Sequence, residues 1–427
     1  MYIQDAKFNV EKEVELKGWL YNSRSSGKLI FLLVRDGTGI IQCVVSKNEI
    51  GDEVFEKARK VTQESSLTVN GVLHEEKRAP GGYELIVKDL NILQIAEDYP
   101  ITPKEHGVAF LMEHRHLWLR SKRQWAILRI RSRIEKSLRD FLDSQGFVLI
   151  DAPILTPSAA ESTTTLFQTD YFGTPAYLSQ SGQLYMEAAC MAFGKVYCFG
   201  PTFRSEKSKT RRHLTEFWML EPEIAYISFE ENLALQENMI TFAVKEVLRN
   251  CREELSIIGR DTKLLEKIEP PFPKIHYREA LEILKENGKE LQWGDDPGGD
   301  EETILSQEFN KPVFVHHFPV GMKAFYMKPD PDDPKTVLAA DLLAPEGYGE
   351  IIGGSQRIDD YDLLLRNIKD NNLPEDSYKW FLDLRKYGSV PHGGFGIGLE
   401  RTLAWIAKLP HVRETIPFPR LLEKIYP

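Results

Sequence analysis

The sequence predicts an α+β protein with two parts, a small all-β domain followed by a larger domain of mixed helices and strands. Short segments with alternating apolar and polar residues fill the first hundred positions, and helical spacing of apolar residues begins after residue 120. A stretch with two prolines, residues 99–103, separates the two patterns. A chain of 427 residues is also long enough for two or three domains.

Five short strands are expected in the first part, with a helix between the third and the fourth. Residues 35–39, RDGTG, form a hairpin signal between the second and third strands, and Pro80 with its two following glycines marks another turn. The strands are residues 14–21, 29–34, 40–45, 66–73 and 84–95, and the helix covers residues 54–61. This order is typical of the OB-type β-barrel. The expected boundaries are 1–97 for the barrel, 98–116 for a linker and 117–427 for the second domain.

Composition narrows the classes of protein. A hydrophobic content of 42% with 28% charged residues is typical of a folded globular chain, and the net charge of -10 argues against a general nucleic-acid coat. We expect a cytoplasmic protein, because the sequence has no apolar run long enough to span a membrane and no signal-peptide pattern at its start. We also expect buried free thiols rather than disulfides or a zinc site, since the cysteines form no C-x-x-C pair. They are Cys43, Cys190, Cys198 and Cys251.

One face of the predicted barrel is a candidate surface for unpaired bases. Phe31 lies in the second strand and Gln42 in the third, where an OB barrel commonly presents aromatic and polar side chains. The alternative, that Phe31 packs in the core and Gln42 is a solvated strand residue, stays open from the pattern alone.

The second domain begins with an amphipathic helix and a strand. Apolar residues at 127, 130, 134, 138 and 141 follow helical spacing, the helix ends at Gly146, and residues 147–150 form a strand before Pro153. The pattern is compatible with an ordinary helix packed on a sheet or with a dimer interface.

A basic segment, residues 203–213, FRSEKSKTRRH, follows a predicted strand. Arginine held at a strand end can meet a phosphate with its planar two-pronged guanidinium. A returning strand, residues 214–223, then places Phe217, Met219 and Glu221 on one face. Since the chain has no P-loop or Rossmann fingerprint, another phosphate site is required. Glycines in residues 390–398, followed by Arg401 in a helical first turn, allow a triphosphate to approach the backbone.

These segments resemble motifs two and three of the class II aminoacyl-tRNA synthetases, and the helix, strand and Pro153 resemble motif one. With the barrel, they match the aspartate, asparagine and lysine subgroup, and four strings are closest to its asparagine-specific members. The strings are SQSGQLYMEA, KAFYMKPDPDDP, LAPEGYGEIIGGSQR and YGSVPHGGFGIGLERTLAW. The resemblance implies an antiparallel sheet flanked by helices, a homodimer, ATP-dependent activation of L-asparagine and transfer of the aminoacyl group to tRNA(Asn).

The resemblance also assigns the ATP site. Arg204 and Arg401 are its catalytic residues, and Asp341 and Glu350 match the magnesium ligands. The implied ATP contacts are Arg204, Glu206, Arg212, His213, Leu214, Phe217, Glu350, Gly398 and Arg401.

For the amino acid, the resemblance implies that Glu221 accepts a hydrogen bond from the side-chain amide and that Arg357 donates to its oxygen. Met186 stands where aspartate-specific members carry a lysine, which favours asparagine over aspartate. The complete implied set is Glu161, Ser181, Gln183, Arg204, Glu221 and Arg357. In the barrel, Phe31 and Gln42 are expected to bind the central anticodon base.

Three other functions are weighed against asparagine–tRNA ligation. They are aspartate–tRNA ligation, ammonia-dependent conversion of activated aspartate to asparagine, and tRNA binding without catalysis. The ammonia-using relatives lack the barrel, and a binding protein is expected to have lost parts of its phosphate site. Residues 257–312 carry no motif that indicates a site.

Overall fold

The structure, a computed structural model, describes residues 1–160 and 165–427. The chain divides into two compact units, Met1–Met112 and Glu113–Pro427. Among the helices of the described residues, none is long and apolar enough to cross a membrane.

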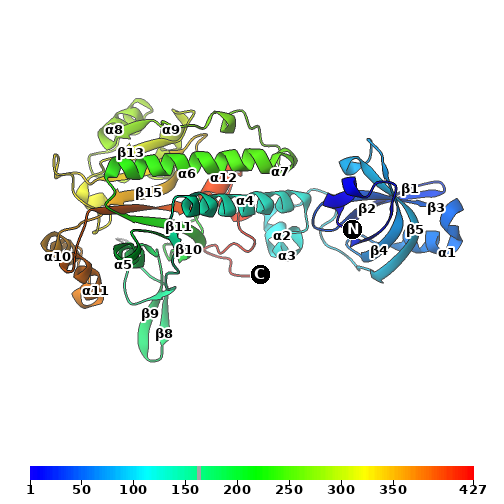
Figure 1. Cartoon of the computed structure of the whole chain (residues 1–427), viewed down its shortest axis with the longest axis horizontal. Coiled ribbons are helices and arrows are strands. Elements are labelled where there is room, and N and C mark those ends of the chain that lie inside the picture. Colours follow the sequence, from blue (N-terminus) through cyan, green and yellow to red (C-terminus); the bar gives the residue numbers. More distant parts are fainter. Residues whose placement is uncertain (161–164) are drawn as a thin grey trace. The chain divides into compact units, whose positions relative to one another are not determined.

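The first unit is a closed barrel with strand order β1-β2-β3-β5-β4, as Figure 1 shows in blue. Its strands are β1 (Glu13–Ser26), β2 (Leu29–Arg35), β3 (Ile40–Ser46), β4 (Ser66–Glu75) and β5 (Tyr83–Gln94), with α1 (Lys47–Lys60) between β3 and β4. Alternate side chains of β1 and β2, including Leu16, Leu20 and Leu32, fill its core. The predicted five-stranded OB-type barrel is therefore confirmed.

Strand β1 is longer than the sequence pattern predicts. The apolar alternation stops at Leu20, where the pairing with β2 shifts register between Leu20 and Asn22. The strand nevertheless continues to Ser26, since its polar end pairs with β2 around a tight turn at Gly27. Hairpin pairing extends the strand beyond the residues that face the core.

The second unit is built on an eight-stranded sheet with the order β12-β13-β14-β15-β16-β11-β10-β6. The inner pairs are antiparallel, and only the outermost pairs, β12 with β13 and β10 with β6, are parallel. The strands are β6 (Val148–Leu149), β10 (Lys195–Phe203), β11 (Glu216–Ala225), β12 (Lys274–His276), β13 (Val313–His316), β14 (Ala339–Ala344), β15 (Gly349–Gln356) and β16 (His392–Gly398). The predicted strand 147–150 is thus only a two-residue edge strand.

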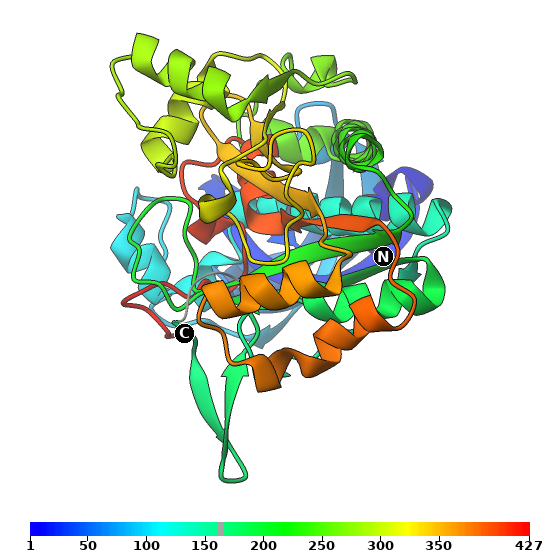
Figure 2. The ribbon, with the colours of Figure 1, turned by 90° about the vertical axis from the view of Figure 1, so that its left-hand side faces the viewer.

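Helices α4 (Lys122–Ser144) and α6 (Phe229–Asn250) run side by side and share one hydrophobic core with the central strands (Figure 1). The predicted apolar face, including Ile127, Ile130 and Ile134, is fully buried in that core. A small three-stranded sheet has the order β7-β9-β8, with β7 (Leu155–Thr156), β8 (Gln168–Tyr171) and β9 (Thr174–Leu178), and its β8–β9 hairpin projects from the second unit (Figure 2). The predicted antiparallel sheet flanked by helices is confirmed.

The second unit also contains the helices α3 (Arg115–Trp118), α5 (Gln183–Phe193), α7 (Arg252–Ile257), α8 (Tyr277–Glu286), α9 (Gly299–Gln307), α10 (Tyr361–Asp370), α11 (Glu375–Lys386) and α12 (Leu399–Ile406). Helix α2 (Val108–Glu113) spans the point in the sequence where the first unit ends. Strand β11 lies between β10 and β16, so the basic segment after β10 and the helix after β16 meet at one end of the sheet. All four cysteines are buried free thiols, as predicted.

Candidate active site

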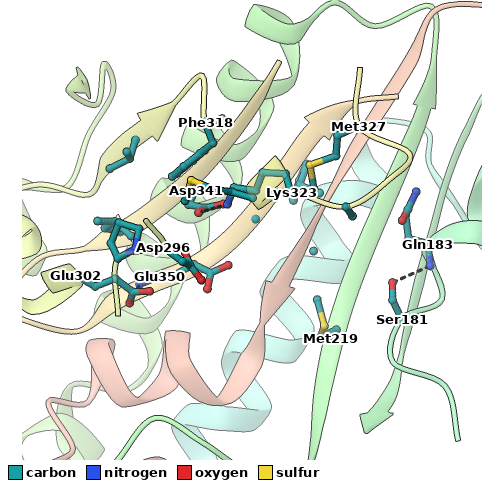
Figure 3. Close-up of a pocket in the computed structure, with 18 of the residues that line it drawn as sticks. Ser181, Gln183, Met219, Asp296, Glu302, Phe318, Lys323, Met327, Asp341 and Glu350 are labelled. Carbon is teal, nitrogen blue, oxygen red and sulfur yellow. Dashed lines mark hydrogen bonds and ion pairs between the residues drawn. The ribbon is translucent and has the colours of Figure 1, made fainter. Parts of the chain in front are cut away.

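A cleft over the central strands consists of two adjoining cavities, of about 400 and 370 Å³. Five residues line both cavities, namely Arg204, Glu206, Met219, Glu350 and Gly396. Figure 3 shows acidic side chains from β14, β15 and the segment before α9 on one side of the first cavity, and residues from the start of α5 on the other. The cleft therefore brings together parts of the chain that are far apart in the sequence.

Arg204 lies at the junction of the two cavities. It directly follows β10, and its backbone N–H donates to the carbonyl of Thr215 at 2.9 Å, which closes the base of the basic loop. Its Nη1 donates to the carbonyl of Gln180, and its guanidinium lies 5.5 Å from the centre of the Phe217 ring. A rigid strand end thus holds this cation between the two spaces.

All nine predicted ATP contacts line the second cavity. Phe217 and Leu214 line it from the returning strand and the loop before it, and Gly398 lines it just before α12. The Nε2 atom of His213 is buried and has no hydrogen-bond partner among the described residues. Burial lowers the pKa of His213, and the attraction of Glu206 offsets this only in part. A neutral imidazole with an unused nitrogen can take part in a ligand contact.

Glu350 and Arg401 form an ion pair in the cavity wall, with Nη1 of Arg401 2.7 Å from Oε2 of Glu350. Burial alone would raise the pKa of Glu350, but Arg401 and Lys323 outweigh it and lower that pKa. Asp341 accepts from Nζ of Lys323 at 2.5 Å, yet burial and the neighbouring Glu350 raise the pKa of Asp341 to about 7. The surroundings therefore contain more negative charge than Lys323 neutralises.

The predicted magnesium ligands face one point. A Cβ atom on Gly353 would lie 3.1 Å from Oε1 of Glu350 and 3.5 Å from Oδ1 of Asp341, so both carboxylates lean over the bare backbone of β15. Carboxylate oxygens are the ligands that Mg²⁺ prefers, and an excess of acid is what a divalent ion relieves. Asp341 and Glu350 fit the ion that the sequence predicts.

A second acidic group does not fit a metal ion. Glu187, Glu223 and His392 are, within the described part of the chain, the only three potential ligands that come within 4.8 Å of one another. Their carboxylates are already occupied by Arg385 and Arg357. This cluster is an ion-pair network.

The first cavity contains the predicted asparagine contacts. Ser181 donates its hydroxyl to Glu221, which also accepts from the backbone N–H of Gly182 at 2.8 Å. Gln183 donates Nε2 to Glu187 and leaves its buried Oε1 without a partner among the described residues. Burial raises the pKa of Glu221, although these donors oppose the shift. The predicted residue Glu161 lies outside the described residues.

Arg357 reaches this cavity from the end of β15 with a fixed orientation. Its guanidinium donates to both oxygens of Glu223, at 3.0 Å from Nε and 2.9 Å from Nη2, and to the hydroxyl of Ser355 at 2.6 Å. Behind it, Glu187 accepts from Arg385 and lies 2.9 Å from Nε2 of His392. Arg385 and His392 hold the pKa of Glu187 at about 2 despite its burial.

The barrel brings its two predicted site residues together. Phe31 is half-buried and lies outside the barrel core, and the guanidinium of Arg24 stacks 4.5 Å from its ring centre. Arg24 also donates to Oε1 of Gln42 at 3.4 Å, while Nε2 of Gln42 donates to Glu84 at 3.1 Å. An aromatic ring, a cation and an amide thus share one face of β1, β2, β3 and β5.

Sequence reasoning missed several cleft residues. Asp296 and Glu302 line the first cavity although residues 257–312 carried no recognisable motif, and Lys323 was noted only inside a family string. Glu187 and Glu223 were not named because each pairs with a partner more than 130 positions away. The signal that could have found Glu223 is its position two residues after Glu221, on a strand whose side chains alternate.

The family described as tRNA synthetases class II (D, K and N) matches residues 108–422, and an OB-fold nucleic acid binding domain matches residues 14–93. These matches define the class of protein, and they agree with the antiparallel sheet, with the barrel, and with Arg357 and Arg401 in the two cavities of the cleft. The chain belongs to the class II tRNA synthetases of the D, K and N group, which confirms the predicted family.

Within this group the similarity is to one kind of enzyme. A relative from Desulforamulus reducens named asparagine–tRNA ligase is 58% identical, over 98% of this chain and 97% of its own length. Another of that name, from Pelotomaculum thermopropionicum, is 59% identical over 97% of each chain. The crystal structure of asparaginyl-tRNA synthetase from Pyrococcus horikoshii complexed with asparaginyl-adenylate has a TM-score of 0.97 and 46% identity, covering 100% of this chain and 99% of that one.

Proposed function

We propose that this chain is an asparagine–tRNA ligase. It joins the carboxylate of L-asparagine to the α-phosphate of ATP, with release of pyrophosphate, and then transfers the asparaginyl group to the 3′ end of tRNA(Asn), with release of AMP. The observation that carries the proposal is the position of Arg204, which lines the ATP cavity and the amino-acid cavity at once. One cation can therefore contact both reacting groups.

The first step needs positioning and charge neutralisation. A carboxylate is already ionised at neutral pH, so no general base is required. Arg204 donates to the α-phosphate and the substrate carboxylate, where negative charge builds up in the transition state. Arg401, in the first turn of α12, donates to the outer phosphates. These two arginines are the catalytic residues.

The rest of the second cavity holds the nucleotide. Phe217 stacks on the adenine ring, whose amino group donates to Glu206, while Leu214 and Gly398 line the cavity walls. Arg212 and His213 bind the outer phosphates. Asp341 and Glu350 would hold Mg²⁺, which would neutralise phosphate charge.

Asparagine is selected by hydrogen-bond polarity. Gln183, through its buried unpaired Oε1, accepts from the α-amino group together with Ser181 and the predicted Glu161. Glu221 accepts from the side-chain amide nitrogen, and Arg357 donates to the amide oxygen. A substrate carboxylate offers no donor to Glu221, and Met186 supplies no cation for it, so aspartate is disfavoured.

The barrel binds the anticodon. Phe31 stacks on its central base and Gln42 hydrogen-bonds to that base, with Arg24 completing the face. Two copies of the chain associate through α4 and β6, where the exposed Val148 and Leu149 offer apolar surface. The enzyme works in the cytoplasm, where its tRNA partner is used.

Pyrophosphate exchange tests the function directly. We expect exchange that depends on asparagine, followed by charging of tRNA(Asn), and no ammonia-dependent formation of asparagine from aspartate. Exchange with aspartate alone would contradict the substrate assignment. No exchange with either amino acid would favour a tRNA-binding protein.

A barrel substitution separates the two steps. Phe31→Ala should raise the KM for tRNA roughly tenfold, because base stacking contributes about 1–3 kcal/mol, and should leave exchange unchanged. Leu29→Ala, on the same strand and exposed, is the matched control. An equal loss of exchange in Phe31→Ala would mean that the ring does not act through the anticodon.

A further inference from the structure

Glu302, in the first turn of α9, connects two parts of the nucleotide site. Its Oε2 accepts from Nη1 of Arg212 at 2.8 Å and from the backbone N–H of Glu350 at 3.0 Å. Nη2 of the same arginine donates to Oγ1 of Thr303 at 2.5 Å and to the carbonyl of Gly347 at 2.7 Å. Three contacts from α9 and from the turn before β15 therefore hold Arg212.

The first residue of β15 leaves room for this ion pair. Gly349 has a left-handed φ of +72°, and a Cβ atom there would lie 2.3 Å from Oε2 of Glu302 and 2.4 Å from Nη1 of Arg212. Any other residue would displace the pair as well as strain the backbone. The glycine thus allows Glu302 and Arg212 to pack directly on the chain that carries Glu350.

The anchored arginine still has hydrogen-bonding capacity. A guanidinium has five N–H donors, and Glu302, Thr303 and Gly347 accept from three of them. Nε and the second hydrogen of Nη1 have no partner in the described ranges 1–160 and 165–427. Arg212 lines the nucleotide cavity, so these two donors are available to a ligand there.

We propose that Glu302 is a positioning residue, which fixes Arg212 so that its remaining donors meet the outer phosphates of ATP. The inference rests on the proposed contact between Arg212 and those phosphates. An arginine side chain loses considerable rotamer freedom when it binds a ligand, and an ion pair formed beforehand lowers this cost. Glu302 itself does not touch the nucleotide and acts only through Arg212.

The test is a double-mutant cycle measured by pyrophosphate exchange with asparagine. Glu302→Gln should raise the KM for ATP roughly five- to tenfold, with kcat and the KM for asparagine within about twofold of the unmodified enzyme. Arg212→Ala should raise the KM for ATP by at least as much. In the Arg212→Ala background, Glu302→Gln should have no further effect, because the group it positions is gone.

Two controls distinguish positioning from a structural defect. Glu301→Gln removes a neighbouring acid of α9 that pairs with Lys289 at 3.0 Å, away from Arg212, and should leave the KM for ATP unchanged. The inhibition constant for AMP, which lacks the outer phosphates, should be unaltered in Glu302→Gln. Thermal unfolding of every variant shows that the assays compare folded proteins.

Each failure has its own meaning. An unchanged KM for ATP in Arg212→Ala would overturn the phosphate contact and, with it, this inference. A raised KM in Arg212→Ala with none in Glu302→Gln would overturn the positioning role alone. The positioning role would also be overturned by additive effects in the double mutant, by weaker AMP binding in Glu302→Gln, or by an equal effect of Glu301→Gln. A lower KM for ATP in Glu302→Gln would overturn it as well, because Glu302 would then hold Arg212 away from ATP.

Discussion

The two halves of the cleft hold their charged groups differently. We take the ATP half to be the second cavity together with the proposed magnesium ligands, Asp341 and Glu350, and the backbone of β15 between them. In this half, the side chains of Arg401 and Glu350 pair with each other while remaining 36% and 33% exposed. In the amino-acid half, Arg357 and Glu223 are 3% and 1% exposed and form a two-pronged pair. The first pair can exchange partners when a ligand enters. The second is fixed before the ligand arrives, and this rigidity suits the choice between an amide and a carboxylate.

A half-buried carboxylate and a fully buried one show the same difference in their pKa values. Asp341, in the ATP half, has one cation against two neighbouring acids, and burial raises its pKa to about 7. Glu187, behind the amino-acid half, has Arg385 and His392 as partners, and its pKa is lowered to about 2. Burial acts in the same direction on both groups, so the balance of partners decides the outcome.

The largest expected effect is at the residue that joins the halves. Arg204→Ala should lower the rate of asparagine-dependent exchange by about 10³-fold or more, because the variant loses transition-state charge stabilisation from a fixed donor. Thermal unfolding should change little, and Arg249→Ala, an exposed arginine of α6, should be neutral. Exchange within tenfold of the unmodified enzyme would contradict the position of the α-phosphate at Arg204.

Removal of Glu223, the fixed partner of Arg357, tests whether the amino-acid half depends on this ion pair. Glu223→Gln leaves a buried cation without its counter-charge and should destabilise the protein by about 3 kcal/mol, measured by denaturant unfolding. The bare cation should also favour a carboxylate, so the ratio of asparagine to aspartate exchange should fall. Glu375→Gln removes an exposed acid and serves as the control. Unchanged stability and selectivity would mean that this half is not preorganised by the pair.

Acid titration separates the halves further. The folded pKa of Glu187 lies below that of an ordinary glutamate, so its stabilising effect is complete above about pH 4.5 and is lost as the pH falls toward 2. The difference in unfolding free energy between the unmodified protein and Glu187→Gln should be roughly 2–3 kcal/mol at neutral pH and should shrink below pH 4.5. A difference that does not depend on pH would show that the partners of Glu187 do not stabilise its charge.

The sequence predicts the residues of the ATP half better than the ion-pair network behind the amino-acid half. Arg204, Phe217 and Arg401 stand in contiguous motifs, so the ATP half could be predicted from neighbouring residues. The network behind Arg357 combines Glu187 and Glu223 with Arg385 and His392, and only the fold brings these residues together. Short motifs report local chemistry, whereas buried networks depend on sheet order.

The same limit applies to the fold. Alternation predicted the barrel strands well, since each has one core-facing side, but it missed the polar end of β1, which is held by hairpin pairing alone. Glu302 was missed for a similar reason. It lies in a short helix whose sequence, GDEETILSQ, looks like any solvated acidic helix until α9 is placed against β15.

The smallest expected effect tests how closely the acids of the ATP half approach each other. Gly353→Ala places a methyl group 3.1 Å from Oε1 of Glu350, so the carboxylates must move apart by a few tenths of an ångström. We expect the Mg²⁺ concentration for half-maximal exchange to rise about threefold, a cost below roughly 1 kcal/mol, with no change in the KM for asparagine. Gly200→Ala, in open space on β10, is the matched control. The opposite result, an unchanged Mg²⁺ dependence with altered asparagine binding, would show that β15 contributes to the amino-acid half at this position. Gly353 would then not belong to the adaptable ATP half.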